Sequence, residues 1–456
     1  MSTATSGAAL LTDLVVLVRD TLRVGVRLFP QILTLWLLGW LGSTLTLQVA
    51  GLVADVSGWA ALAVFSFSFL STLTAIVLIL RLCGHELGIR GLIPRGEAAD
   101  DDRDTSLTRL LAVTLLPFLG LYAAFGQVED RASMLQTDQI FRNSVFGPPT
   151  VLQTVRGFAT AHPWAMLLLL VAVYAVRRAV DAAHEQTGWR PLGLVVALIE
   201  SFFLLVVIFG GFSVANRVRA WLATRAFLAW FDGIGDAVRS VLAAVHASLP
   251  AALDRLVGFV SDDLGPLLWT VLSEPVIWLA VAALVYGSQV LSFAELWRKG
   301  QPLARRLPGV SVFDRRVDRR ALRPLPPAGL RRAGVEVKEA FLGDLDDKYL
   351  PTFHSLRLVL RAGVVFFGAY VLVYNALAVA RHSVTRLYEL VLGGHETSFW
   401  YLYGPYLDLL ENLPWELLRI CLLAVAFRRC LELFQQRGQA LADARPEGVA
   451  AEVVAP

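Results

Sequence analysis

The stretch GPLLWTVLSEPVIWLAVAALVY (residues 265–286) contains one charged side chain, Glu274, and is otherwise almost entirely apolar. A helix of about 20 predominantly apolar residues is long enough to cross the hydrocarbon core of a bilayer. Runs of this kind recur along the chain, whose 456 residues are 56% hydrophobic and only 17% charged. A soluble protein of this size would alternate its apolar residues with a polar face. The sequence therefore predicts an all-α, polytopic integral membrane protein.

About eight candidate transmembrane helices can be counted along the chain. They lie near residues 30–52, 57–82, 107–127, 163–180, 191–213, 274–297, 355–380 and 412–433. Arginine-bearing connections alternate with connections that are poorer in arginine, and the positive-inside rule then places both termini in the cytoplasm. Only three lysines accompany the many arginines, which suggests a GC-rich, bacterial genome. We expect a multi-pass protein of the cytoplasmic (inner) membrane.

Two stretches both begin with Gly-Pro and end with proline: GPLLWTVLSEP (residues 265–275) and GPYLDLLENLP (residues 404–414). Proline fits the first turn of a helix and disfavours helical geometry in the residue before it. We expect each stretch to form an interfacial helix of about two turns at the outer surface, ending at Glu274 or Leu413, before a spanning helix begins. The elbow prolines are Pro266, Pro275, Pro405 and Pro414.

The repeated pattern of Gly-Pro and a later proline predicts four tandem helix hairpins, related as pseudo-repeats. The expected units are an N-terminal amphipathic interfacial helix (1–29), hairpin 1 with a cytoplasmic acidic loop (30–105), hairpin 2 (106–190), hairpin 3 (191–297) with outer amphipathic helices (214–262), a basic cytoplasmic insertion (298–350), hairpin 4 (351–436) and a disordered tail (437–456). For the first unit, arginines at i, i+4 and i+8 (Arg19, Arg23, Arg27) indicate a helix on the membrane surface, with an extension of the first span as the alternative.

Three polar side chains inside predicted spans are candidates for a polar path. Glu200 lies about 14 Å into its span, where a carboxylate costs several kcal/mol unless it is paired, protonated or wetted. Arg419 enters from the other side and can pair with Glu200, or with Glu416 on its own helix. Asn375 is a further buried polar group, of a type that often joins two helices. A structural role is the alternative for each.

Pairs of arginines mark expected cytoplasmic helix ends and the basic insertion. They serve either as topology anchors or as forks that bind lipid phosphate, which makes anionic membrane lipids the expected partners. The arginines concerned are Arg177, Arg178, Arg428, Arg429, Arg315, Arg316, Arg319 and Arg320.

Acidic residues between spans offer a weak metal-binding pattern. Asp100, Asp101 and Asp104 spell DDxxD, and a second acidic cluster (344–347) falls between later spans. The placement resembles that of membrane prenyltransferases, in which two acidic motifs hold Mg²⁺ on a diphosphate. Here the first cluster lies in a linker and the second lacks clear ligand spacing.

The sequence contains no HExxH, GxSxG, GxxxxGK[ST] or CxxC motif, which argues against an enzyme of those classes. The first hypothesis is transport or lipid handling through a polar path between repeated hairpins. The second is a non-catalytic scaffold or accessory subunit of a cell-envelope membrane complex, and the third is a magnesium-dependent transferase acting on a lipid-linked substrate. No cofactor and no nucleic-acid partner is expected.

Overall fold

The computed structural model describes residues 2–89, 126–144, 149–187, 190–211, 264–290 and 363–443, together with residue 259 and parts of 111–123. Every secondary-structure element in these ranges is a helix. Six described segments are long and apolar enough to cross a membrane: Phe29–Ala54, Gly58–Glu86, Pro163–Val180, Leu192–Gly210, Gly265–Tyr286 and Val365–Leu392. The prediction of an all-helical chain with several apolar spans is confirmed at this level.

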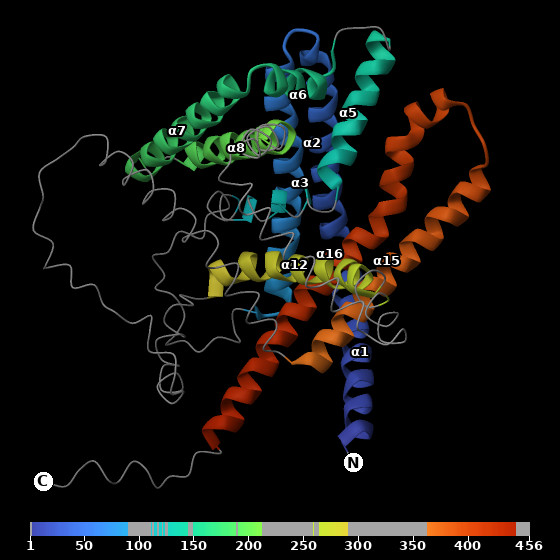
Figure 1. Cartoon of the computed structure of the whole chain (residues 1–456). Coiled ribbons are helices and arrows are strands. Elements are labelled where there is room, and N and C mark those ends of the chain that lie inside the picture. Colours follow the sequence, from blue (N-terminus) through green and yellow to red (C-terminus); the bar gives the residue numbers. More distant parts are fainter. Residues whose placement is uncertain are drawn as a thin grey trace, which may run out of the picture.

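The first hairpin consists of α2 (Phe29–Ala54) and α3 (Gly58–Glu86), which lie side by side over most of their length (Figure 1). Glycine makes this approach possible: a Cβ added at Gly39 would lie 2.4 Å from the Cβ of Ala75. The Ser71 hydroxyl donates to the Gly39 carbonyl at 3.1 Å. Small residues thus bring the two backbones close enough for a side chain to bond across the interface, as in other membrane helix pairs.

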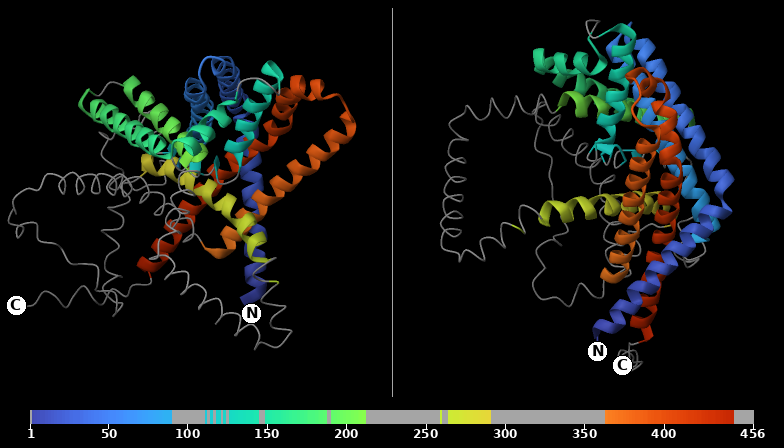
Figure 2. Two further views of the ribbon diagram at one scale, coloured as in Figure 1. Left: turned by 45° about the horizontal axis from the view of Figure 1, so that its top comes forward. Right: turned by 90° about the vertical axis from the view of Figure 1, so that its right-hand side faces the viewer.

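Helix α1 (Ser2–Arg27) precedes α2 with only Leu28 between them. It packs against α15 (Val364–Leu392) and α16 (Thr397–Asp443), and its side chains at Leu17 and Val24 are buried there. Helix α1 thus packs against the last hairpin, and both its placement on the membrane surface and the alternative of an extended first span stay predictions. The start of α1 and the end of α16 lie at the same end of the molecule (Figures 1 and 2).

Four helices that follow α3 in the sequence pair with one another differently from the expected hairpins. They are α5 (Gln127–Asn143), α6 (Val151–Ala161), α7 (Pro163–Thr187) and α8 (Arg190–Val206), the last continuing into the π-helical turn η2 (Val207–Gly211). Helix α7 packs on α8, although the sequence places them in separate hairpins. The arrangement of four tandem hairpins is therefore not confirmed.

Helix α12 (Gly265–Val290) crosses α15 and α16 instead of lying parallel to them (Figures 1 and 2). Tyr286, near its end, is fully buried and donates from its hydroxyl to the Leu80 carbonyl of α3 at 2.7 Å. The same ring stacks on Phe427 of α16, with centroids 5.0 Å apart. These contacts place α12 at the junction of the first and last hairpins.

The prediction that the two proline-bracketed stretches form separate short helices is wrong. Helix α12 runs continuously through Pro275, and α16 runs through Pro405 and Pro414, changing direction along its length (Figure 1). Pro266 does lie in the first turn of α12, as its geometry favours. Proline inside a membrane helix is tolerated when neighbouring groups bond the carbonyl that it frees, and α15 supplies such a group at Pro275.

The predicted disordered tail begins too early, because α16 continues to Asp443. Glutamine, alanine, leucine and arginine predominate there, and all are good helix formers. The proposed outer helices (214–262), apart from residue 259, lie outside the described residues, as do the basic insertion (298–350) and residues 444–456.

Candidate functional site

Side chains of α15 donate hydrogen bonds to backbone carbonyls of α12 around Pro275. Proline lacks an N–H, so the carbonyl four residues earlier, that of Val271, loses its helical partner. The Asn375 side chain replaces this partner: its Nδ2 donates to the Val271 carbonyl at 3.1 Å. The same nitrogen donates to the carbonyl of Val371, on its own helix, at 2.8 Å. The Tyr370 hydroxyl donates to the Pro275 carbonyl at 2.9 Å. Asn375 therefore holds a proline-interrupted helix against its neighbour.

A charged network adjoins this position. Glu274, directly before Pro275, accepts a hydrogen bond from the Tyr374 hydroxyl at 3.0 Å and lies 4.0 Å from Arg419 of α16. Arg419 also bonds Glu416, the partner three residues earlier on the same helix that the sequence offered as one of its two options. Its guanidinium lies over the Trp278 ring, 4.3 Å from the centroid, a favourable cation–π arrangement.

A second arginine, which the sequence did not single out, lies in the helical core. Arg131, on α5, extends its guanidinium between α2 and α3, near the middle of both helices. It donates from Nη1 to the Ser43 hydroxyl and the Ser68 carbonyl, each at 3.2 Å, and from Nη2 to the Thr72 hydroxyl at 3.0 Å. In the sequence, Arg131 follows the predicted span 107–127 among acidic and polar residues, and no local signal shows that it points inward.

Aromatic rings lie between the two guanidinium groups. Arg131 lies over the rings of Phe69 and Tyr122, 5.0 and 5.5 Å from their centroids. The Tyr122 ring is in turn 6.2 Å from that of Trp278, which lies beneath Arg419. Helices α3, α5, α12, α15 and α16, together with Tyr122, thus bring two arginines, two glutamates and several aromatic rings together. These residues range from Phe69 to Arg419 in the sequence.

Glu200 lies in a different part of the fold. Its side chain is 1% exposed and pairs with Arg177 of α7, Nη2 to Oε1 at 3.5 Å. The predicted pairing of Glu200 with Arg419 is therefore wrong, because α7 packs on α8 and Arg419 is bonded by glutamates of α12 and α16. Arg177 forms a buried pair, whereas the adjacent Arg178 is exposed.

The later arginine pair joins helices at the end of the molecule where α1 begins. Arg428 and Arg429 both bond Glu432, at 2.9 and 3.2 Å, and Arg429 also contacts Asp13 of α1 at 3.3 Å. The contact of Arg429 with Asp13 ties α16 to α1. Binding of lipid phosphate by this pair stays a prediction.

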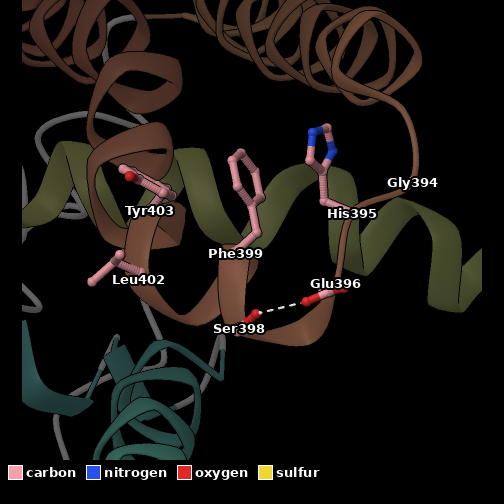
Figure 3. Close-up of a pocket in the computed structure, with 7 residues that line it drawn as sticks. All are labelled: Gly394, His395, Glu396, Ser398, Phe399, Leu402 and Tyr403. Carbon is pink, nitrogen blue, oxygen red and sulfur yellow. Dashed lines mark hydrogen bonds between the residues drawn. The ribbon is translucent and has the colours of Figure 1, made fainter.

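At the tip of the α15–α16 hairpin, an open pocket of about 540 Å³ is lined by aromatic and polar side chains (Figure 3). Phe399 stands between His395 and Tyr403, with ring centroids 4.1 and 5.0 Å away. The surrounding segment, FWYLYGPY (residues 399–406), is rich in tryptophan and tyrosine, which concentrate where a membrane meets water. The tip has the composition of an interfacial anchor.

A polar cluster connects this tip to α5. Asp138 accepts a hydrogen bond from the Tyr401 hydroxyl at 2.6 Å and forms an ion pair with Arg142, whose Nε lies 2.8 Å away. The Phe141 and Tyr401 rings stack, with centroids 4.2 Å apart. Partial burial, and then the bond to Asp138, raises the pKa of the Tyr401 hydroxyl, while the same carboxylate raises the pKa of Arg142. The cluster fixes the start of α16 beside the first hairpin.

Several predicted residues lie outside the described residues. They are Asp100, Asp101, Asp104, the second acidic cluster (344–347), Arg315, Arg316, Arg319 and Arg320. Within the described ranges, no group of three or more histidine, cysteine, aspartate or glutamate side chains could hold a metal ion.

Comparison with known proteins adds no relative. No family model, no curated protein and no solved structure matches the chain.

Proposed function

We propose that this chain transports a substrate, or handles lipid, along a polar path that passes the Pro275 position of α12. The observation that carries the proposal is the charged network of Glu274, Arg419 and Glu416 beside that proline. Charged residues within membrane segments are costly and mark substrate or ion pathways. Interrupted helices at such positions expose backbone groups to a ligand in many transporters. A location in the cytoplasmic membrane with both termini inside is part of the proposal.

The path can be tested by thiol labelling, because a cysteine reacts as its thiolate, which forms in water and not in lipid. The native cysteines, Cys83, Cys421 and Cys430, are buried and would first be replaced. Single cysteines are then placed at Tyr374, beside the network, and at Leu372, which is 54% exposed on another face of α15. Tyr403→Cys at the tip is the positive control. A membrane-impermeant maleimide is added to the full chain in vesicles.

A water-filled path predicts rapid labelling at positions 374 and 403 and little at 372, which faces lipid. Equal, slow labelling at 374 and 372, with 403 reactive, would show that the network is dry and would refute the path.

A second candidate is a non-catalytic scaffold of a membrane complex. Specific observations favour it: Glu200 is paired with Arg177, and Asn375 bonds the carbonyl freed by Pro275. Arg419 bonds Glu416, so all three polar candidates from the sequence have structural partners. A dry network in the labelling experiment would support this candidate.

A further inference from the structure

Arg131 differs from the other two arginines in the core of the described structure, because they have carboxylate partners. Arg177 pairs with Glu200, and Arg419 bonds Glu416. Among the described residues, no carboxylate oxygen lies within 4.0 Å of the Arg131 guanidinium. Glu416 is near enough to attract Arg131 electrostatically, but its carboxylate is bonded to Arg419.

The groups that do bond Arg131 are neutral. They are two hydroxyls, of Ser43 and Thr72, and one backbone carbonyl, of Ser68. Neutral acceptors satisfy N–H groups but leave the positive charge uncompensated, and a guanidinium cannot lose its proton in a protein. Arginines inside membrane segments pair with a counter-charge, a backbone carbonyl or water, and of these the described partners of Arg131 supply only the carbonyl of Ser68.

The Arg131 guanidinium keeps donors that its described partners do not use. A guanidinium has five N–H donors, and the described partners make two bonds to Nη1 and one to Nη2. None of the three involves Nε. Neighbouring guanidinium donors can bind the paired oxygens of a carboxylate or phosphate. Taken over the whole residue, Arg131 is only partly buried.

We propose that Arg131 binds an oxyanion, a phosphate or a carboxylate, in the space bordered by α2, α3 and α5. The guanidinium lies over the rings of Phe69 and Tyr122, and the hydroxyls of Ser43 and Thr72 accept its hydrogen bonds. The anion is either the headgroup of a lipid or a free ion. That this anion is the substrate class rests on the proposed transport or lipid-handling function. The binding of an anion by Arg131 does not depend on that function.

The experiment uses the full chain in nanodiscs and measures thermal unfolding, since a ligand that binds only the folded state raises Tm. One arm uses phosphatidylcholine discs titrated with inorganic phosphate, with sodium chloride at equal ionic strength as the baseline. The other arm replaces part of the lipid with phosphatidylglycerol and adds no phosphate. The variants are Arg131→Gln and Arg131→Lys. The control is Arg156→Gln, which removes the same charge from a side chain that is 53% exposed.

We expect the wild type and Arg156→Gln to show the same rise in Tm in at least one arm, which identifies the source of the anion. Arg131→Gln should weaken the apparent affinity about tenfold or more, and Arg131→Lys should weaken it less because it keeps the charge but loses the planar fork. The proposal is overturned if the wild type shows no rise in either arm, or if Arg131→Gln responds as the wild type does.

If Arg131→Gln does not fold, Arg131→Lys decides, and an affinity equal to that of the wild type overturns the proposal. The labelling experiment at Tyr374 reports on water and not on anions. A wet path with no Arg131-dependent response would therefore refute the oxyanion site and leave the transport function standing.

Discussion

Asn375 of α15 donates a hydrogen bond to the carbonyl of Val271 in α12, the group that Pro275 deprives of its helical partner. In an apolar surrounding, a carbonyl without a donor is costly, so a single amide from the neighbouring helix lets α12 continue through its proline. The contact joins a local backbone defect to a tertiary partner about a hundred residues later in the chain.

Replacing Asn375 with leucine should therefore destabilise the fold by about 1–3 kcal/mol, the cost of leaving a buried acceptor unsatisfied. Pro275→Ala restores an N–H at position 275, which can bond the Val271 carbonyl within the helix. The cost of Asn375→Leu should consequently be smaller in the Pro275→Ala background. A double-mutant cycle, measured by thermal or denaturant unfolding in detergent, checks this. Strictly additive effects would show that Asn375 acts elsewhere.

The close contact of α2 and α3 predicts intolerance at Gly39. A Cβ there would lie 2.4 Å from the Cβ of Ala75, a rigid neighbour, so Gly39→Ala must push the two helices apart. Overpacking of this kind typically costs about 1–3 kcal/mol. Gly368 of α15 is the matched control, since nothing lies within 4 Å of its added Cβ. Gly368→Ala should be neutral or slightly stabilising, and equal unfolding temperatures for the two variants would contradict the prediction.

The Arg177–Glu200 pair predicts a strongly non-additive response. Removing one partner leaves a buried charge and typically costs about 3–5 kcal/mol, whereas replacing both by apolar residues of similar size is often nearly neutral. We expect Glu200→Leu to destabilise the protein and Arg177→Met/Glu200→Leu to recover much of the loss. Unfolding in detergent measures both. The double variant also separates roles: if it is stable but fails to complement a deletion of the gene, Glu200 has a function beyond the ion pair.

Asp408, in the part of α16 before the predicted span, predicts a pH effect. Partial burial, and then repulsion by Glu411, raises the pKa of this carboxyl, while Arg381 opposes the shift. A raised folded-state pKa means that folding favours the protonated form, so the stabilising contribution is present below the ordinary pKa of 3.8 and is lost as pH rises through the folded value. Asp408→Asn, which is always neutral, should therefore unfold at a higher temperature than the wild type at pH 7.

The difference in unfolding temperature should shrink as pH falls toward 3.8 and both proteins carry a neutral side chain at position 408. Glu389→Gln, on an exposed part of α15, removes the same charge and is the control. A gain in stability for Asp408→Asn that does not change with pH would show that ionisation is not its cause.

Local sequence was sufficient where the governing interaction is local or is with lipid. Apolar length alone predicted the helices later found at Phe29–Ala54, Gly58–Glu86 and Val365–Leu392. The i−3 spacing also offered the bond between Arg419 and Glu416. Hydropathy and helical periodicity report such features directly, because each residue contributes to them whatever its distant neighbours are.

The same local rules failed at the elbow prolines. Proline geometry predicts a helix boundary before Pro275, yet α12 continues, because the deciding group, Asn375, belongs to another helix. Arg131 was missed for a related reason: its residue type and neighbours suit a solvated helix end, and only the packing of α5 against α2 places it between membrane helices.

By itself, the sequence determined that this chain is helical and apolar enough to cross a membrane repeatedly, since transfer of apolar residues out of water depends on composition along the chain. Only the tertiary structure decided which charges meet. Glu200 pairs with Arg177, Arg419 with Glu416 and Glu274, and Arg131 with neutral hydroxyls and a carbonyl. Electrostatic pairing depends on distance in space, which helix packing sets and residue order does not.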